Sequence, residues 1–158
     1  MNRSDYDKLI MDFCSVCQME GADSILAGGP VSINDVTFSL NYSEELEENL
    51  VLIFCDFGLP AAGREAEVYR ALMETNLLLY MLNGPLFSIS PDTGRVLFVN
   101  RCWLQQLTPV KLRDLLVQFA TQAKDWRTHQ LLDKPPLRSG QSSTARMLAN
   151  SLLAKPGS

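Results

Sequence analysis

Cysteines are the residues of this sequence that could most readily do chemistry. Cys14 and Cys17 form a Cys-x-x-Cys pair, the spacing of redox-active thiols. A redox pair is expected at the start of a helix, where the helix dipole lowers the thiol pKa. These two cysteines instead fall late in a predicted helix, on or near its apolar face. Zinc binding would need two further ligands, and the isolated Cys55 and Cys102 have no diagnostic spacing. We therefore expect the pair to pack as small apolar side chains, and we predict no metal site.

Other short motifs form no catalytic arrangement. Asp92-Thr93-Gly94 spells the aspartic-protease tripeptide, but such a site needs a second carboxylate, and Pro91 with the flanking strands predicts a hairpin turn. His129 is the only histidine and lies at the margin of a predicted tail, a poor place for a catalytic base. Gly28-Gly29-Pro30 lacks the Lys-Ser/Thr of a phosphate loop. The acidic run 44–48 lacks the alternating ligands and central glycine of a calcium loop. The sequence thus predicts no enzyme and no cofactor.

Composition excludes several classes of partner. The 158 residues are 46% hydrophobic and 20% charged, which is typical of a globular domain. The formal net charge of −4 disfavours a nucleic-acid or anionic-membrane partner. The polar, acidic N-terminus has no secretory-signal pattern, and the longest apolar stretch, Leu77 to Leu82, is far too short to cross a bilayer. We expect a protein of the reducing cytoplasm.

Charge and composition divide the chain at about residue 130. Residues 1–130 carry ten basic and seventeen acidic side chains, whereas residues 131–158 carry four basic and one acidic side chain. The second segment is also rich in proline, serine and glycine near its start. We predict a folded domain over 1–130 and a flexible, weakly basic C-terminal tail over 131–158.

Hydrophobic periodicity predicts eight elements in the domain. A helix from Ser4, its expected N-cap, to Met19 precedes a short strand somewhere within Ser24 to Ile33. Alternating residues predict a strand over 36–42, and a continuous apolar run predicts a strand over 50–57 that is covered on both faces. Next come a helix over about 63–82, a hairpin over 86–103 and a helix capped by Thr108. The order α-β-β-β-α-β-β-α predicts an α+β fold with an antiparallel sheet.

The middle helix is apolar around most of its circumference. Tyr69, Leu72, Met73, Asn76, Leu77 and Tyr80 form its principal stripe. Such a helix needs more than one partner surface, and in a small domain one of those surfaces can belong to another subunit. Together with the absence of a catalytic arrangement, this excess of apolar surface indicates a protein-binding module.

Four segments, in this order, resemble the Tir chaperone (CesT-like) family of class I type III secretion chaperones. They are Ile33-Asn34-Asp35-Val36-Thr37-Phe38-Ser39-Leu40, Leu52-Ile53-Phe54-Cys55-Asp56-Phe57-Gly58-Leu59-Pro60, Tyr69-Arg70-Ala71-Leu72-Met73-Glu74-Thr75-Asn76-Leu77-Leu78 and Ser88-Ile89-Ser90-Pro91-Asp92-Thr93-Gly94-Arg95-Val96. A last helix that ends in Trp126 completes the pattern, so the resemblance covers about residues 3–128.

The resemblance implies a homodimeric, non-enzymatic chaperone of the bacterial cytoplasm. Such a chaperone binds the N-terminal region of a secreted effector and keeps it extended and competent for export. The secretion-system ATPase is a further candidate partner. The resemblance places the dimer interface at Tyr69, Leu72, Met73, Asn76, Leu77 and Tyr80. It places effector-binding grooves at Leu9, Ile10, Phe13, Val36, Phe38, Leu40, Leu52 and Phe54. Each of these fourteen positions could equally be core, which the sequence does not decide.

Two other functions remain open at this stage. The same fold could serve as a dimeric adaptor or regulatory module with no export role, which would bind a folded surface rather than an extended peptide. A redox protein that uses Cys14 and Cys17 is the third alternative. The identity and number of effectors, the organism and the role of the tail cannot be read from the sequence.

Overall fold

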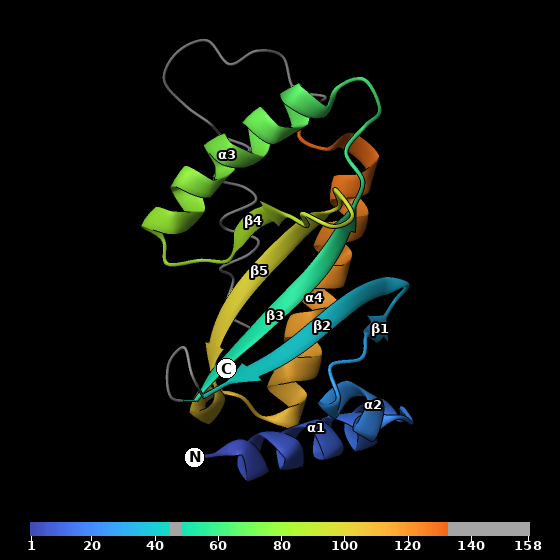
Figure 1. The fold of residues 1–158 in the computed structure, drawn as a ribbon, viewed down its shortest axis with the longest axis vertical. Helices are drawn as coiled ribbons and strands as arrows, with labels where there is room; N and C mark the ends of the chain where they lie inside the picture. Colours follow the sequence, from blue (N-terminus) through green and yellow to red (C-terminus); the bar gives the residue numbers. More distant parts are fainter. Residues whose placement is uncertain (45–48, 133–158) are drawn as a thin grey trace.

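The computed structural model describes residues 1–44 and 49–132 (Figure 1). Of the tail predicted over 131–158, residues 133–158 lie outside the described residues, as does the centre of the acidic run, 45–48. The helices are α1 (Arg3–Cys17), α2 (Ala22–Leu26), α3 (Glu65–Met81) and α4 (Pro109–His129), with a short 3-10 turn at Leu104–Gln106. The strands are β1 (Val31–Ile33), β2 (Val36–Ser43), β3 (Leu50–Gly58), β4 (Leu86–Ile89) and β5 (Val96–Trp103).

The five strands form one antiparallel sheet in the order β1-β2-β3-β5-β4. β1 and β2 form one hairpin, and β4 and β5 form another. β2 also pairs with β3, and β5 lies between β3 and β4 in the sheet. Helix α4 runs along one face of the sheet, α1 crosses its end, and α3 lies beside β4 at the opposite end of the molecule (Figure 1). The α+β fold class predicted from the sequence is therefore confirmed.

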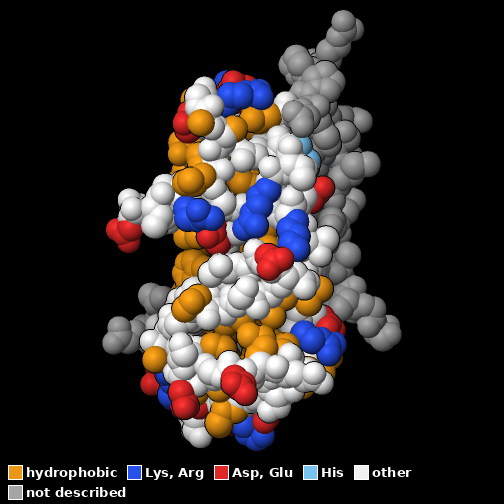
Figure 2. Space-filling model, turned by 90° about the vertical axis from the view of Figure 1, so that its right-hand side faces the viewer, with side chains coloured by type: hydrophobic (Ala, Val, Ile, Leu, Met, Phe, Trp, Pro, Cys, Tyr) orange, Lys and Arg blue, Asp and Glu red, His pale blue; other side chains and the backbone are white. Residues whose placement is uncertain are grey.

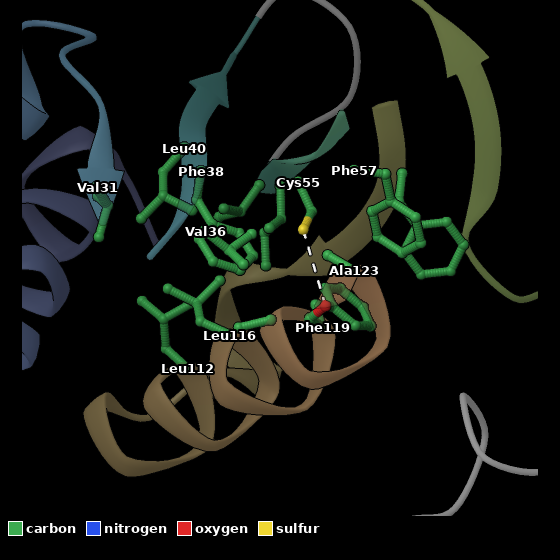
Figure 3. Close-up of a cluster of buried hydrophobic side chains, with 14 of the residues drawn as sticks. Val31, Val36, Phe38, Leu40, Cys55, Phe57, Leu112, Leu116, Phe119 and Ala123 are labelled. Carbon is green, nitrogen blue, oxygen red and sulfur yellow. Dashed lines mark hydrogen bonds between the residues drawn. The ribbon is translucent and has the colours of Figure 1, made fainter. Parts of the chain in front are cut away.

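The core lies between this sheet and α4. Val36, Phe38 and Leu40 of β2 point toward Leu112 and Leu116 of α4 (Figure 3). Deeper in the core, the thiol of Cys55 donates a weak hydrogen bond to the carbonyl oxygen of Phe119, with 3.9 Å between the sulfur and the oxygen. Five aromatic rings, with centroids 4.7 to 5.8 Å apart, fill the end of the core nearest α3. They belong to Phe57, Phe87, Phe98, Phe119 and Trp126.

Helix ends follow the expected chemistry, with one difference. Thr108 caps α4 by accepting a hydrogen bond from the Lys111 N–H, and Pro109 begins the helix as predicted. In α1 the cap is Asn2 rather than Ser4. The side chain of Asn2 accepts from the Asp5 N–H, and the Asp5 carboxylate accepts from the Asn2 N–H, which makes a reciprocal capping box.

The expected short strand within Ser24 to Ile33 is confirmed as β1, whereas the coverage predicted for the strand over 50–57 was wrong. Ala22–Leu26 is the short helix α2, and only Val31–Ile33 of the expected segment is a strand. The run of β3 is not covered on both faces. Val51, Ile53 and Cys55 are buried, whereas Leu52 and Phe54 are only partly buried on the opposite face. Burial therefore alternates along β3. The sequence does not show this alternation, because both faces of β3 carry apolar residues.

Candidate functional site

Among residues 1–44 and 49–132, three surfaces carry apolar side chains that the described chain covers incompletely. The first is the sheet face turned away from α4, which we call the outer sheet face. Strand register aligns Phe54 with Val99 of β5, and Leu52 and Leu97 lie on the adjacent rows. All four side chains are partly buried. Apolar side chains held in a flat, regular array suit an extended chain whose own side chains alternate.

Polar side chains frame the outer sheet face. Asp56 lies on the same face of β3 and accepts a hydrogen bond from Arg95, with 2.7 Å between the carboxylate oxygen and Nε. Ser39 pairs with Phe54, and Asn41 pairs with Leu52, so β2 presents a polar border. A polar border around an apolar centre is the usual anatomy of a protein-binding surface.

The second surface lies where α1, α2 and β1 meet. Met19, Leu26 and Ile33 pack against the core but remain partly exposed. Figure 2 shows hydrophobic side chains at the surface of this lower part of the molecule, with charged side chains around them. Arg3 donates a hydrogen bond to the carbonyl oxygen of Leu26 at 3.0 Å, which ties α2 to α1. Sequence reasoning missed this surface, because it placed no helix at Ala22–Leu26.

The third surface is one side of α3, which we call the α3 face. Met73, Leu77 and Tyr80 are 70%, 65% and 72% exposed, and Tyr69 lies one turn earlier on the same side. The opposite side of α3 enters the core through Val68, Leu72, Thr75 and Leu79. An apolar helix side of this length is unusual on a monomeric protein.

The predicted groove residues occupy two different environments. Six of the eight are buried in the core of the chain and cannot contact a partner in this conformation. These are Leu9, Ile10, Phe13, Val36, Phe38 and Leu40. Leu52 and Phe54 are the two that reach a surface, on the outer sheet face. The six buried residues belong to the hydrophobic core.

The predicted interface residues divide in the same way. Tyr69, Met73, Leu77 and Tyr80 form the α3 face. Leu72 is buried in the core, and Asn76 is partly buried against β4. Asn76 holds the backbone of Phe87 with two hydrogen bonds, which fixes α3 beside the sheet.

Burial governs the chemistry of the Cys-x-x-Cys pair. Cys14 is buried, and Cys17 is partly buried on the same helix. Desolvation raises the pKa of both thiols, which is opposite to the lowered pKa of a nucleophilic redox pair. Within residues 1–44 and 49–132, no group of three metal-ligating side chains comes together.

Comparison with known families gives the assignment. The model of the Tir chaperone protein (CesT) family matches residues 31–127, more than half of the sequence. The chain belongs to the Tir chaperone family. Membership confirms the resemblance recognised in the sequence and the prediction of an effector-binding chaperone. A search of curated protein sequences gives no match.

Solved structures share the fold of this Tir chaperone family member. A chain of the ExsC–ExsE complex is 16% identical, with a TM-score of 0.62 over 84% of this chain and 98% of its own. A chain of the HopA1–SchA chaperone–effector complex is 16% identical, with a TM-score of 0.61 over 81% and 98%. The Yersinia pestis type III secretion chaperone SycH, in complex with a fragment of YscM2, gives a match at 15% identity. Its TM-score is 0.56 over 76% and 98%.

The family match begins at β1, so α1 and α2 precede it. Both helices are integral to the fold, because α1 packs against α4 and Ile25 of α2 is buried in the core. The Tyr6 hydroxyl donates a hydrogen bond to the carbonyl oxygen of Leu40, and the Tyr6 ring stacks on Tyr42 with centroids 5.1 Å apart. No helix among the described residues is long and apolar enough to span a membrane.

Proposed function

We propose that this protein is a bacterial cytoplasmic chaperone that holds the N-terminal segment of a secreted effector extended and competent for export. Family membership supports the role, and the apolar outer sheet face is the observation that carries the binding mode. Phe54 and Val99 are register partners there, and Leu52 and Leu97 lie on the adjacent rows, spaced to receive alternate side chains of an extended segment. The structural neighbours include a chaperone–effector complex, which agrees with this proposal.

A client would meet several apolar surfaces in turn rather than one deep pocket. An unfolded segment loses conformational entropy when it binds, so its affinity must come from several contacts together. The outer sheet face and the surface of Met19, Leu26 and Ile33 lie on different parts of the domain. Only an extended client can contact both, whereas a folded partner would cover one. This distribution favours the chaperone over the adaptor alternative.

The proposed assembly is a homodimer joined through the α3 face. Burying Tyr69, Met73, Leu77 and Tyr80 against the same residues of a second copy would give a two-fold symmetric contact. The chaperone unit is residues 1–130, and it acts without catalysis. The secretion-system ATPase is the proposed partner that receives the loaded chaperone.

The test is purification of the tagged full chain from its native host, followed by mass spectrometry. The protein should retain one or a few partners through an N-terminal segment that also binds when expressed alone. A Phe54→Asp variant should lose at least tenfold in affinity for that segment, because it places a carboxylate in an apolar contact. A Thr121→Asp variant, at an exposed position of α4 on the other side of the sheet, is the matched control. Recovery of folded partners alone would favour the adaptor.

A further inference from the structure

The sheet has two edges, and they differ in how their backbone groups are occupied. β4 and β1 are the outermost strands. An edge strand presents unpaired N–H and C=O groups that can pair with any extended chain. Under the proposed function, an extended client can pair with either edge. A chaperone that binds its client in one register therefore needs a device that discriminates between them.

The outward backbone groups of β4 are set by its hairpin. The Ser90 N–H donates to the Arg95 carbonyl oxygen at 2.9 Å, which closes the turn. Because hydrogen-bonded and non-hydrogen-bonded pairs alternate in an antiparallel ladder, the Phe87–Phe98 pair is non-hydrogen-bonded. The N–H and C=O of Phe87 therefore point away from β5, toward the position of a further strand.

Asn76 of α3 fills that position. Its Oδ1 accepts a hydrogen bond from the Phe87 N–H at 2.7 Å, and its Nδ2 donates to the Phe87 carbonyl oxygen at 2.9 Å. A side-chain amide offers one acceptor and donors in the same plane as a peptide group. The two bonds are those that a residue of an added strand would make.

We infer that Asn76 is a specificity-determining residue that replaces a sixth strand at the β4 edge and so restricts client strand addition to the β1 edge. This inference deepens the proposed function and rests on it. The β4 edge has only four residues, and Phe87 carries the backbone pair near its centre. A chain that paired with β4 would have to break both Asn76 bonds first.

Within the part of the chain that the structure describes, no side chain caps the β1 edge in this way. Asn34 and Asp35 form the two-residue β1–β2 turn, with φ of 50° and 62°. Ile33 and Val36 close this turn, so by the same alternation the backbone N–H and C=O of Ser32 point outward. Among the described residues, β1 pairs with β2 alone. The partly exposed Ile33 and the nearby surface of Leu26 and Met19 flank this edge, so an added strand would also gain apolar contacts.

The experiment compares where an extended probe pairs with the wild-type protein and with Asn76 variants. The probe is a synthetic peptide with the sequence of residues 36–43, which alternates apolar and polar residues and carries a benzophenone group in place of its phenylalanine ring. Photo-crosslinked residues are mapped by mass spectrometry. In the Asn76→Leu variant we expect new crosslinks within residues 86–89 that the wild-type protein does not show.

A second measurement follows the backbone directly. Amide hydrogen exchange of Phe87 should become roughly tenfold faster in Asn76→Leu, corresponding to the loss of one hydrogen bond. Asn76→Asp keeps the acceptor for the Phe87 N–H but loses the donor, so the Phe87 amide should stay protected. A residue that served only to pack α3 would not separate these two variants. Arg70→Ala, at an exposed position of the same helix, is the control for general loosening of α3.

The inference is overturned if Asn76→Leu yields no crosslinks at 86–89, or if the wild-type protein already yields them. Either result overturns the inference about Asn76. This holds whether or not the probe crosslinks to β1, and whether or not a natural client is found. A failure of the proposed function would instead appear as loss of the client in the purification experiment while the crosslinks at 86–89 still appeared in the variant.

Discussion

The four cysteines of the described chain are free thiols that are buried or partly buried. Burial raises the pKa of each one, and it raises the pKa of Cys102 to about 11. A thiol with a raised pKa forms its reactive thiolate only at higher pH, so near neutral pH less of it is reactive than in free cysteine. The Cys-x-x-Cys spacing is therefore a consequence of helical packing on α1.

At the residue scale we first predict slow thiol chemistry. Cys17, the more exposed member of the pair, should react with iodoacetamide more slowly than free cysteine near neutral pH, and its rate should rise at a higher pH than that of free cysteine. Mass spectrometry of the modified peptide across a pH series checks this. The same protein unfolded in urea is the control and should react at the ordinary rate. A Cys17 that reacts faster than free cysteine would revive the redox alternative.

Arg127 supports the second prediction at this scale. Its Nε donates to the Phe57 carbonyl oxygen at 2.7 Å, and its Nη2 donates to the Asp56 carbonyl oxygen at 2.8 Å. These bonds join α4 to the irregular end of β3, where the register shifts between Asp56 and Gly58. Arg127→Leu should lower the free energy of unfolding by about 1–2 kcal/mol, because two hydrogen bonds to a charged donor are lost at a partly exposed site.

Urea unfolding measures this change as a lower midpoint with an unchanged slope. Lys124→Leu, at an exposed position one turn earlier on α4, is the matched control and should leave the midpoint within error. Equal midpoints for the two variants would show that Arg127 contributes nothing to the join between α4 and β3.

At the scale of elements, α3 has a core side and an exposed apolar side. We expect Leu77→Asp to convert the proposed dimer to a monomer, because dimerisation would bury an unpaired charge. Leu77 is 65% exposed within the chain, so the protomer itself should keep its thermal stability. Leu72→Asp does not give this test, because Leu72 is buried in the core and its substitution would unfold the protomer.

Light scattering gives the molar mass that decides the outcome. Met11→Asp introduces the same charge at another exposed apolar position, on α1, and should leave the mass unchanged. If Leu77→Asp retains the mass of the wild-type protein, the α3 face is not the interface.

Periodicity predicted most elements because their two faces differ in polarity. The strands of 36–42 and 86–103 and the capped last helix follow from alternation, turn residues and Thr108. The five-residue helix α2 was missed because one turn and a half shows no period. On α3 both sides are apolar, so the sequence could not tell the buried Val68 and Leu79 from the exposed Met73 and Leu77.

The candidate site was predictable only in part for the same reason. β3 is apolar at nearly every position, so the pattern could not show that Leu52 and Phe54 face away from α4 while Ile53 and Cys55 face it. The pairing of Asn76 with Phe87 joins residues eleven positions apart through a change of direction in the chain. No local pattern signals such a contact.

At the scale of the whole molecule, the C-terminal end of α4 closes the domain. Gln130 ends the helix with a positive φ of 47°, and its side chain accepts a hydrogen bond from the Ala61 N–H at 2.6 Å and donates to the Leu59 carbonyl oxygen at 3.1 Å. Leu131 and Leu132 pack against the core just beyond it. The described contacts of the domain therefore extend to residue 132, two residues beyond the predicted boundary at 130.

A chain that ends at Leu132 should consequently unfold within about 2 °C of the full-length protein, since every buried side chain of the described residues is kept. A chain that ends at Asp125 removes Trp126, which is 1% exposed and contacts the Phe57 ring, together with the Arg127 and Gln130 bonds. Loss of the indole alone costs about 3–5 kcal/mol, so this shorter chain should be largely unfolded. Differential scanning calorimetry of the three chains checks both expectations. A marked loss of stability in the chain ending at Leu132 would mean that residues 133–158 belong to the folded unit, and the predicted division of the chain near residue 130 would have to be abandoned.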